Sequence, residues 1–338
     1  MGIKAFIAGC AGTRLNGEER AFFAGEQPWG FILFARNIDT PEQVRALTGE
    51  LRECVGRADA PVLVDQEGGR VQRLRPPRWP AYPPARLLGD LYRRDAAAGL
   101  RACWLQSRLI AFDLAALAIN IDCLPVLDVP VAGASDVIGD RAYSPEPDEV
   151  AQLGRAAADG LISGGVLPVI KHIPGHGRAT ADSHLELPVV DTERAILGCT
   201  DFHPFMQLAD LPLAMTAHVV YTAFDRQRPA TASPIVIGEV IRGWLGFDGL
   251  LMSDDLSMRA LSGEFAERAR ACFAAGCDVV LHCSGAMSEM AAVAAACPVL
   301  EGKPAWRARV ALERAGGADG SDEAALRAEF AALTGAFA

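Results

Sequence analysis

The sequence has no long hydrophobic run, although 51% of its 338 residues are hydrophobic. No apolar segment reaches the roughly 18 residues that a membrane-spanning helix needs. The opening stretch, MGIKAFIAGCAGTRL, lacks a basic region followed by a full apolar core, so it does not resemble a signal peptide. Phe6 stands where an N-myristoylation motif requires Ser or Thr. We therefore expect a cytoplasmic protein that does not associate with membranes.

Basic residues are also scarce. The chain has 32 Lys and Arg against 42 Asp and Glu, which gives a formal net charge of −10. No stripe of Lys and Arg with interleaved aromatic residues stands out, and aromatic residues make up only 7% of the chain. Nucleic acid is therefore not expected as a partner.

Paired cysteine motifs are absent: the nine Cys form no CxxC pair. Their number is also odd. This pattern favours reduced, mostly buried thiols over a disulfide framework. Cys272, Cys277, His282 and Cys283 lie close enough in sequence to raise a metal site. Cys277 and Cys283 flank an apolar segment, however, and Cys is commonly buried as a small hydrophobic residue. We expect neither a metal nor another cofactor.

Short apolar segments alternate with helical patterns along most of the chain. Thr40 and Pro41 have the residue types of a helix N-cap and first position, and Gln43 would close a capping box. Strands are expected near residues 3–7, 31–34, 61–64, 118–123, 166–170, 213–217, 249–252 and 277–281. Helices are expected from Thr40, at 92–117, from Ser144 to 163, at 192–208, from Ser233 to 246, at 258–275, and in the Ala-rich tail.

This alternation predicts an α/β protein with a parallel sheet and helices outside it. Periodicity alone does not separate an open sheet from a closed barrel. Polar residues at the strand ends favour the barrel, because a barrel gathers those ends around one mouth. No repeat, linker or second core is evident. We predict a single (β/α)₈ TIM-type barrel domain over residues 1–338, with these strand-end residues at its mouth: Asp65, Asp122, Lys171, His172, His218, Asp254 and His282.

Residues 171–184, KHIPGHGRATADSH, concentrate polar side chains in a chain that has only six His. Pro174, Gly175 and Gly177 indicate an irregular loop after the preceding strand. In an extended backbone, the spacing in Asp182-Ser183-His184 puts the Asp and His side chains on one side. The carboxylate could then orient the imidazole, as Asp does in a Ser-His-Asp triad.

Three classes of function remain open from these residues: a glycosidase, a metal-dependent barrel hydrolase and a non-catalytic sugar-binding protein. The metal hydrolase is disfavoured because there is no HxH or HExxH pair, and Lys171 would oppose a cation beside His172. A Ser nucleophile is disfavoured because no GxSxG elbow exists. Asp254, in an apolar context at a strand exit, suits a glycosidase nucleophile. Asp255 is expected to be a helix N-cap.

The remaining histidines have less specific interpretations. His176 lies between two glycines and could equally brace the loop or contact a substrate. His218 and His282 are expected to be core histidines with satisfied hydrogen bonds.

Four stretches together resemble the bacterial β-N-acetylglucosaminidases of glycoside hydrolase family three. They are DQEGGRVQR at 65–73, IGDR at 138–141, KHIPGHG with ADSH at 171–184, and SDDLSM at 253–258. Ile173 stands where the family usually has Phe, and we expect no effect from this change. The resemblance implies a barrel without the additional C-terminal domain of related β-glucosidases.

The resemblance also implies site residues and a reaction. Asp254 matches the nucleophile, His184 the acid/base and Asp182 its partner. The reaction would be a retaining exo-hydrolysis through a covalent glycosyl-enzyme, releasing terminal N-acetylglucosamine from muropeptides in cytoplasmic cell-wall recycling. We expect a monomer that acts on this oligosaccharide substrate. The residues that match binders of the terminal sugar are Asp65, Arg73, Arg141, Lys171 and His172.

Overall fold

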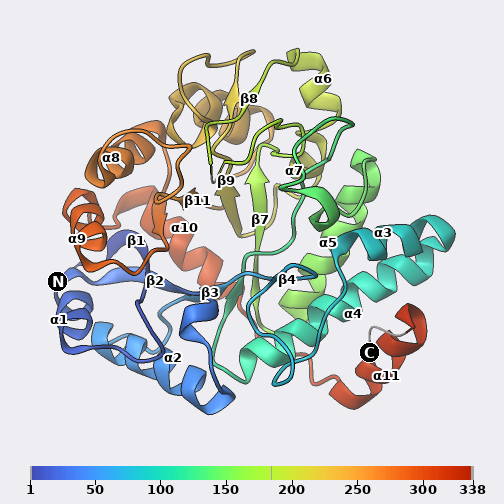
Figure 1. Ribbon diagram of the computed structural model, residues 1–338, viewed down its shortest axis with the longest axis horizontal. Helices are drawn as coiled ribbons and strands as arrows, with labels where there is room; N and C mark the ends of the chain where they lie inside the picture. Colours follow the sequence, from blue (N-terminus) through green and yellow to red (C-terminus); the bar gives the residue numbers. More distant parts are fainter. Residues whose placement is uncertain (1, 184, 336–338) are drawn as a thin grey trace.

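The fold is a closed barrel of eight parallel strands, as predicted from the sequence. The computed structural model describes residues 2–183 and 185–335. Around the barrel the strands follow the order β1, β12, β11, β9, β7, β6, β3 and β2. Figure 1 looks roughly along the barrel, with the strands at the centre and the helices around them. Their bounds are β1 Lys4–Gly9, β2 Pro28–Leu33, β3 Val62–Val64, β6 Ile121–Asp122, β7 Leu167–Ile173, β9 Leu213–Thr216, β11 Leu250–Asp255 and β12 Val279–His282.

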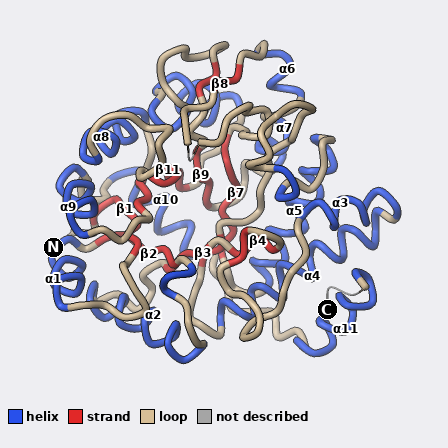
Figure 2. The backbone as a smooth tube through the Cα atoms, in the orientation of Figure 1, coloured by secondary structure: helices blue, strands red, loops and turns tan. Residues whose placement is uncertain are grey.

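The helices form the outer layer, which Figure 2 shows as a ring of helical tubes around the strands. Short paired strands outside the barrel are β4 Gln66–Gly68 with β5 Val71–Gln72, and β8 Val189–Val190 with β10 Val220–Tyr221. The helices are α1 Gly17–Glu26, α2 Pro41–Val55, α3 Ala85–Arg94, α4 Ala96–Ala115, α5 Pro147–Ser163, α6 Arg194–Cys199, α7 His203–Gln207, η4 Val236–Trp244, α8 Phe265–Ala275, α9 Met287–Ala296, α10 Gly302–Glu313 and α11 Glu323–Thr334, with short turns η1 Ala35–Asn37, η2 Gly139–Arg141 and η3 Ala230–Ala232.

The side chains of each strand alternate between two hydrophobic cores, one inside the barrel and one between the strands and the helices. Ile7 and Met252 point into the barrel, whereas Phe6 and Leu251 point outward to the helices. The barrel interior is filled by such residues from every strand, as in other barrels of this class. The interior is therefore a packed floor, and polar chemistry is confined to the mouth.

The start of α2 illustrates how local sequence defines an element. The Thr40 hydroxyl accepts a hydrogen bond from the Gln43 backbone N–H, and Pro41 occupies the first turn. The helix ends at Gly56, whose φ of 62° favours glycine. The predicted capping box is wrong, because the Gln43 side chain accepts from the Asp39 N–H instead of from Thr40.

Several predicted helices are interrupted in the structure. The helix expected over 92–117 is two helices, α3 and α4, because Asp95 has an extended backbone and its carboxylate caps α4 through the Ala98 N–H. The helix expected over 192–208 is likewise divided into α6 and α7. Ser144 is not the N-cap of α5, since Glu146 takes that position and its N–H bonds to the Ser144 hydroxyl. The helix expected from residue 258 begins only at Phe265, because residues 256–264 form a loop at the barrel mouth.

None of the helices in the described part of the chain is long and apolar enough to cross a membrane.

Candidate active site

A cavity of about 270 Å³ opens at the C-terminal ends of the barrel strands. Residues from β2, β3, β7, β9, β11 and β12 or the segments just after them meet there. The structure thus brings together all the predicted sugar-binding residues and the predicted nucleophile. The lining residues are Ile32, Phe34, Asp65, Val71, Arg73, Arg141, Lys171, His172, Met215, Asp254, Asp255, Met258, Leu281 and Cys283.

Asp65 follows β3 and is held between two cations. The Lys171 ammonium lies 2.9 Å from one carboxylate oxygen, and an Arg73 guanidinium nitrogen lies 2.9 Å from the other. Burial alone would raise the pKa of the Asp65 carboxyl, but the cations outweigh burial and hold that pKa below its usual range. Asp65 is therefore an anionic acceptor at neutral pH, in an orientation set by two ion pairs.

Glu67 is a site residue that the sequence analysis did not single out, although it lies within the DQEGGR motif. Its carboxylate accepts two hydrogen bonds from Arg141, at 2.9 and 2.8 Å, and lies 2.6 Å from the Lys171 ammonium. Burial would raise its pKa, but Arg141 and Lys171 lower it below the ordinary value. Glu67 thus aligns two predicted sugar-binding cations through one carboxylate.

The β4–β5 hairpin places Glu67 in this position. Gly68 has φ 95°, and a Cβ there would lie 2.4 Å from the Pro83 carbonyl oxygen. Only glycine fits such a close approach at positive φ. The Gln66 side chain also accepts hydrogen bonds from the Arg73 and Leu74 N–H groups, which closes the hairpin.

Lys171 and His172 both line the cavity, although successive side chains of a regular strand alternate between faces. The pairing of β7 with β9 shifts register between Lys171 and Ile173. Such irregularities commonly re-aim side chains next to active sites. Burial would lower the pKa of Lys171, but Asp65 and Glu67 raise it above its ordinary value, so its ammonium stays charged.

Asp128 is a second functional residue that sequence reasoning missed. One carboxylate oxygen lies 2.7 Å from His172 Nδ1, and the other accepts from the backbone N–H groups of His172 and His176. Burial would raise the pKa of Asp128, but the neighbouring His172 outweighs it and lowers the pKa to about 2. Asp128 therefore fixes the ring of His172 in the cavity wall. It lies six positions beyond the short strand β6, so no local pattern marks it.

Asp254 lies near the end of β11, on the cavity wall. The pairing of β11 with β12 shifts register between Met252 and Asp255, which is the second irregularity at the mouth. One Asp254 carboxylate oxygen accepts from the Asp255 N–H at 2.7 Å. This contact holds one oxygen by the backbone beside the cavity.

Asp255 is not a helix N-cap, contrary to expectation. It ends β11, and α8 begins ten positions later. Its carboxylate accepts from the N–H groups of Ser257 and Cys283. Asp255 therefore tightens the turn after the strand and joins β11 to β12, which steadies the neighbouring Asp254.

The predicted acid/base pair lies on the segment that follows His176. His184 lies outside the described residues, so its pairing with Asp182 stays a prediction. The Asp182 carbonyl accepts from the Leu185 and Glu186 N–H groups, at 2.9 and 3.0 Å, which marks a tight turn. The Ser183 side chain is buried within this turn.

The side chains of His218 and His282 are buried and are not among the residues that line the sugar cavity. His218 is fully buried, with Nδ1 2.8 Å from the Thr231 hydroxyl and Nε2 3.0 Å from the Asp255 carbonyl oxygen. His282 is also buried, and its Nε2 lies 2.9 Å from the Ser284 hydroxyl. Its buried Nδ1 has no hydrogen-bond partner among the described residues, so the expectation of a fully satisfied ring is wrong for His282. Within the described residues, no group of His, Cys, Asp and Glu is arranged to hold a metal ion.

Asp122, although it ends β6, is not among the residues that line the cavity. It is fully buried and accepts from the Gln66 N–H, and burial raises its pKa well above the ordinary value. The hydrogen bond from Gln66 to Asp122 supports the connection between β3 and β4.

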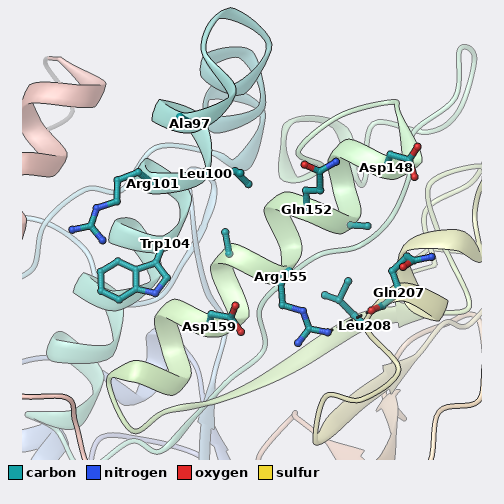
Figure 3. A pocket seen from close by; sticks show the side chains of 12 residues that line it. Ala97, Leu100, Arg101, Trp104, Asp148, Gln152, Arg155, Asp159, Gln207 and Leu208 are labelled. Atoms are coloured by element: carbon teal, nitrogen blue, oxygen red, sulfur yellow. Dashed lines mark hydrogen bonds between the residues drawn. The ribbon is translucent and has the colours of Figure 1, made fainter.

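A larger cavity, of about 810 Å³, lies on the outer surface between α4, α5 and α7 (Figure 3). Its Arg155 pairs with Asp210, and its Arg101 pairs with Glu329 of α11. Arg101 also lies over the Trp104 ring. The lining residues come from these helices and the residue after α7, not from the barrel strands, and both arginines are used in surface ion pairs. The chemical site is therefore the smaller cavity at the mouth.

Comparisons with known proteins agree with this geometry. The family model described as "Glycosyl hydrolase family 3 N terminal domain" matches residues 6–309. A β-hexosaminidase of Alkalilimnicola ehrlichii is 44% identical over 282 residues, which cover 82% of this chain and 80% of that protein. A β-hexosaminidase of Bordetella avium is 40% identical over 280 residues, covering 81% and 79%.

Solved structures extend the likeness to the whole fold. The crystal structure of NagZ from Neisseria gonorrhoeae, in complex with N-trifluoroacetyl-D-glucosamine, superposes with a TM-score of 0.89. The two chains are 32% identical, and the match covers 100% of this chain and 99% of that one. The chain therefore belongs to glycosyl hydrolase family 3, as a glycoside hydrolase of the β-N-acetylhexosaminidase type.

Proposed function

We propose that the protein is a retaining exo-β-N-acetylglucosaminidase whose nucleophile is Asp254. The observation that carries this proposal is the cavity at the barrel mouth, which Asp254 lines together with Asp65, Lys171 and His172. The packed barrel interior closes the floor of the cavity, with Met215 and Leu281 among the lining residues. A blind cavity of this kind suits a terminal sugar rather than the middle of a chain.

In the first step, Asp254 attacks the anomeric carbon while the bond to the leaving oxygen breaks. His184 donates a proton to that oxygen, which gives a free alcohol and a covalent glycosyl-enzyme. In the second step, His184 takes a proton from water, and the resulting oxygen nucleophile attacks the anomeric carbon. The ester bond to Asp254 then breaks, and both groups return to their starting protonation states. Two inversions give net retention.

A histidine can replace the usual second carboxylic acid because the ordinary imidazole pKa lies close to neutrality. Asp182 would hold the ring in one tautomer, as an Asp does beside the His of a hydrolase triad.

The charged network of the cavity suits a sugar rich in hydroxyl groups. Carboxylate oxygens of Asp65 accept hydrogen bonds, and the N–H groups of Lys171, Arg73 and Arg141 donate them. The shifted pKa values of Asp65, Glu67 and Lys171 keep all three groups ionised across neutral pH. The N-acylated glucosamine bound by the related Neisseria protein supports an N-acetylated sugar as the substrate here.

We further propose that the natural substrates are muropeptides that carry terminal N-acetylglucosamine, and that a monomer processes them in the cytoplasm during cell-wall recycling. The resemblance of the KHIPGHG and ADSH motifs supports this role.

The proposal is tested by comparing aryl β-N-acetylglucosaminide with aryl β-glucoside. We expect a far higher kcat/KM on the first, and equal values would contradict the assigned sugar. Proton NMR during hydrolysis should show the β-anomer of the released sugar first, because the mechanism retains configuration. Initial release of the α-anomer would contradict the double displacement.

A further inference from the structure

Ser183, between Asp182 and His184 in the chain, is held from two directions. Its hydroxyl oxygen lies 3.2 Å from His176 Nε2, and its carbonyl oxygen accepts from the Ala260 N–H at 3.2 Å. The side chain is only 3% exposed. A buried serine in an otherwise irregular surface segment indicates a docked structure, because burial of a hydroxyl is favourable only when it is hydrogen-bonded.

His176, the partner of Ser183, is itself rigidly placed. The Asp128 carboxylate accepts from the His176 N–H at 2.6 Å, and the His172 ring meets the His176 ring edge-on at 5.7 Å between centroids. Desolvation, followed by the nearby His172, lowers the pKa of His176 to about 4. The ring is therefore neutral at physiological pH, with one nitrogen available to the Ser183 hydroxyl.

The backbone beside His176 is fixed as well. The Tyr221 hydroxyl donates to the Gly175 carbonyl, and the Arg178 guanidinium pairs with Asp201 at 2.9 Å. A Cβ at Gly177 would lie 2.2 Å from the Val129 carbonyl oxygen, so the chain passes there in close contact. The first part of the loop is thus an anchored platform for the turn around Ser183.

The second contact of Ser183 leads to the loop that carries the nucleophile. Ala260 lies six positions after Asp254, and Met258 between them lines the sugar cavity. Ser183 therefore bridges two units: the platform around His176 and the loop after β11. Because a peptide bond joins Ser183 directly to Asp182, fixing the Ser183 hydroxyl and carbonyl groups also restricts the position of the Asp182 backbone.

We propose that Ser183 is a positioning residue that, together with His176, locks the acid/base segment onto the loop of the nucleophile. This role rests on the proposed function, because it presumes that His184 is the acid/base. It accounts for His176, which the chemistry does not use directly. Displacement of a catalytic group by about 1 Å can cost about 10²-fold in rate, so loss of the lock should be visible in kinetics.

The test compares Ser183→Ala with Thr180→Ala, which removes an exposed hydroxyl from the same loop and serves as the matched control. Each variant is assayed on a natural-type disaccharide, whose leaving group needs a proton, and on p-nitrophenyl β-N-acetylglucosaminide, whose leaving group needs little help. We expect Ser183→Ala to lose about 10- to 100-fold in kcat/KM on the disaccharide and less than about threefold in kcat/KM on the aryl substrate. The comparison uses kcat/KM because this parameter reports the glycosylation step, whereas kcat also includes the later hydrolysis that needs His184 as a base. Thr180→Ala should resemble the wild type on both.

The final extent of labelling with a 5-fluoro-N-acetylglucosaminyl fluoride gives the fraction of competent enzyme, and the rates are normalised to that fraction. The rate of labelling is a second measurement. Fluoride departs without a proton, so the labelling rate of Ser183→Ala should stay within about twofold of wild type. Equal losses on both substrates, or a labelling rate that falls in parallel, would show a merely structural serine and overturn the proposal. So would a Ser183→Ala variant that matches Thr180→Ala.

A double-mutant cycle tests the partner. His176→Gln should reproduce the substrate-dependent loss, and adding Ser183→Ala to it should cost little more, because both remove the same contact. Additive losses would overturn the pairing of the two residues. If the wild type itself neither cleaves N-acetylglucosaminides nor becomes labelled, the proposed function fails. If it does both while Ser183→Ala behaves like the control, only the positioning role fails.

Discussion

The acids at the barrel mouth differ mainly in their neighbours. Asp65 and Glu67 are each held by two cations, and Asp128 is held by His172 and two backbone N–H groups. Asp65 and Glu67 therefore position cations, and Asp128 positions the His172 ring. Asp254 lines the cavity, and one of its carboxylate oxygens accepts from the backbone N–H of Asp255.

We expect Glu67→Gln to impair both sugar binding and stability. Removing one charge of a buried ion pair leaves Arg141 and Lys171 partly uncompensated, which typically costs about 3–5 kcal/mol of unfolding free energy. KM for the aryl N-acetylglucosaminide should rise, because both cations face the cavity. Urea unfolding and steady-state kinetics measure the two effects. Glu53→Gln, at an exposed position of α2, is the control, and an equal response of both variants would contradict the role of Glu67.

Burial of neutral His176 makes stability depend on pH. Its pKa is lowered to about 4 in the folded state, against about 6.5 in an unfolded chain. Between these values the unfolded state binds more protons, so the contribution is present above about pH 6.5 and is lost as the pH falls towards 4. The groups that act on its ring are Asp128, His172 and Asp254.

Urea unfolding at several pH values between 4 and 7 should show this loss in the wild type. In His176→Asn the slope should be shallower by up to one proton, or about 1.4 kcal/mol per pH unit. An unchanged slope would mean that His176 is not the buried neutral group.

His184→Ala should separate substrates by their leaving groups. Nitrophenolate departs with little protonation, whereas a sugar alkoxide does not. The variant should therefore retain glycosylation by the activated aryl substrate and lose about 10²–10⁴-fold more on a disaccharide. Burst-phase and steady-state kinetics on both substrates measure the difference. Equal losses would remove His184 from the acid/base role.

The sequence motifs predicted which side chains lie at the barrel mouth, but not which residues hold those side chains in place. Asp65, Lys171 and Asp254 could be placed at the mouth because each follows an apolar strand. Glu67 and Asp128 could not, because their partners lie 74 and 44 positions away in the chain. Such pairings arise from closure of the barrel, which has no local signature.

At the scale of elements, irregular ends of β7 and β11 shape the site. Each strand shifts register against a neighbour where its polar residues begin. The apolar segments predict strands that end at residues 170 and 252, whereas β7 and β11 continue to Ile173 and Asp255. Polar strand residues look like loop residues when periodicity is the only guide.

The opposite end of the barrel carries a structural ion network. Asp278, just before β12, accepts from Arg242 at 2.7 Å and from Arg307 of α10 at 2.8 Å. It also accepts from the Leu251 N–H in β11. The network thus joins η4 and α10 to adjacent strands, at the barrel end away from the sugar cavity.

Asp278→Ala should therefore destabilise the fold without altering catalysis. Loss of the shared carboxylate leaves two guanidinium groups partly unpaired, at a cost of about 3–5 kcal/mol. Kinetics normalised to labelled active sites should match the wild type. Thermal unfolding should show a lower Tm than Asp59→Ala, an exposed replacement of the same type. A specific loss of kcat would contradict this separation of stability from chemistry.

For the molecule as a whole, barrel closure explains why distant motifs form one site. The DQEGGR segment follows β3, KHIPGHG begins within β7 and SDDLSM begins within β11. The strand order brings the ends of these three strands to one mouth. The alternation of segments predicted parallel strands, and the strand-end residues predicted the barrel. The divided helices at 92–117 and 192–208 were missed because a local break such as Asp95 does not disturb the wider periodicity.

In the proposed mechanism, Asp254 forms a covalent bond to the sugar. The most direct test of this bond is mass spectrometry of protein treated with a 5-fluoro-N-acetylglucosaminyl fluoride, digested and sequenced as peptides. We expect one added sugar per chain, carried at Asp254 on the peptide that contains SDDLSM, and no adduct on Asp254→Ala. An adduct on another residue, or turnover without any adduct alongside normal activity of Asp254→Ala, would contradict it.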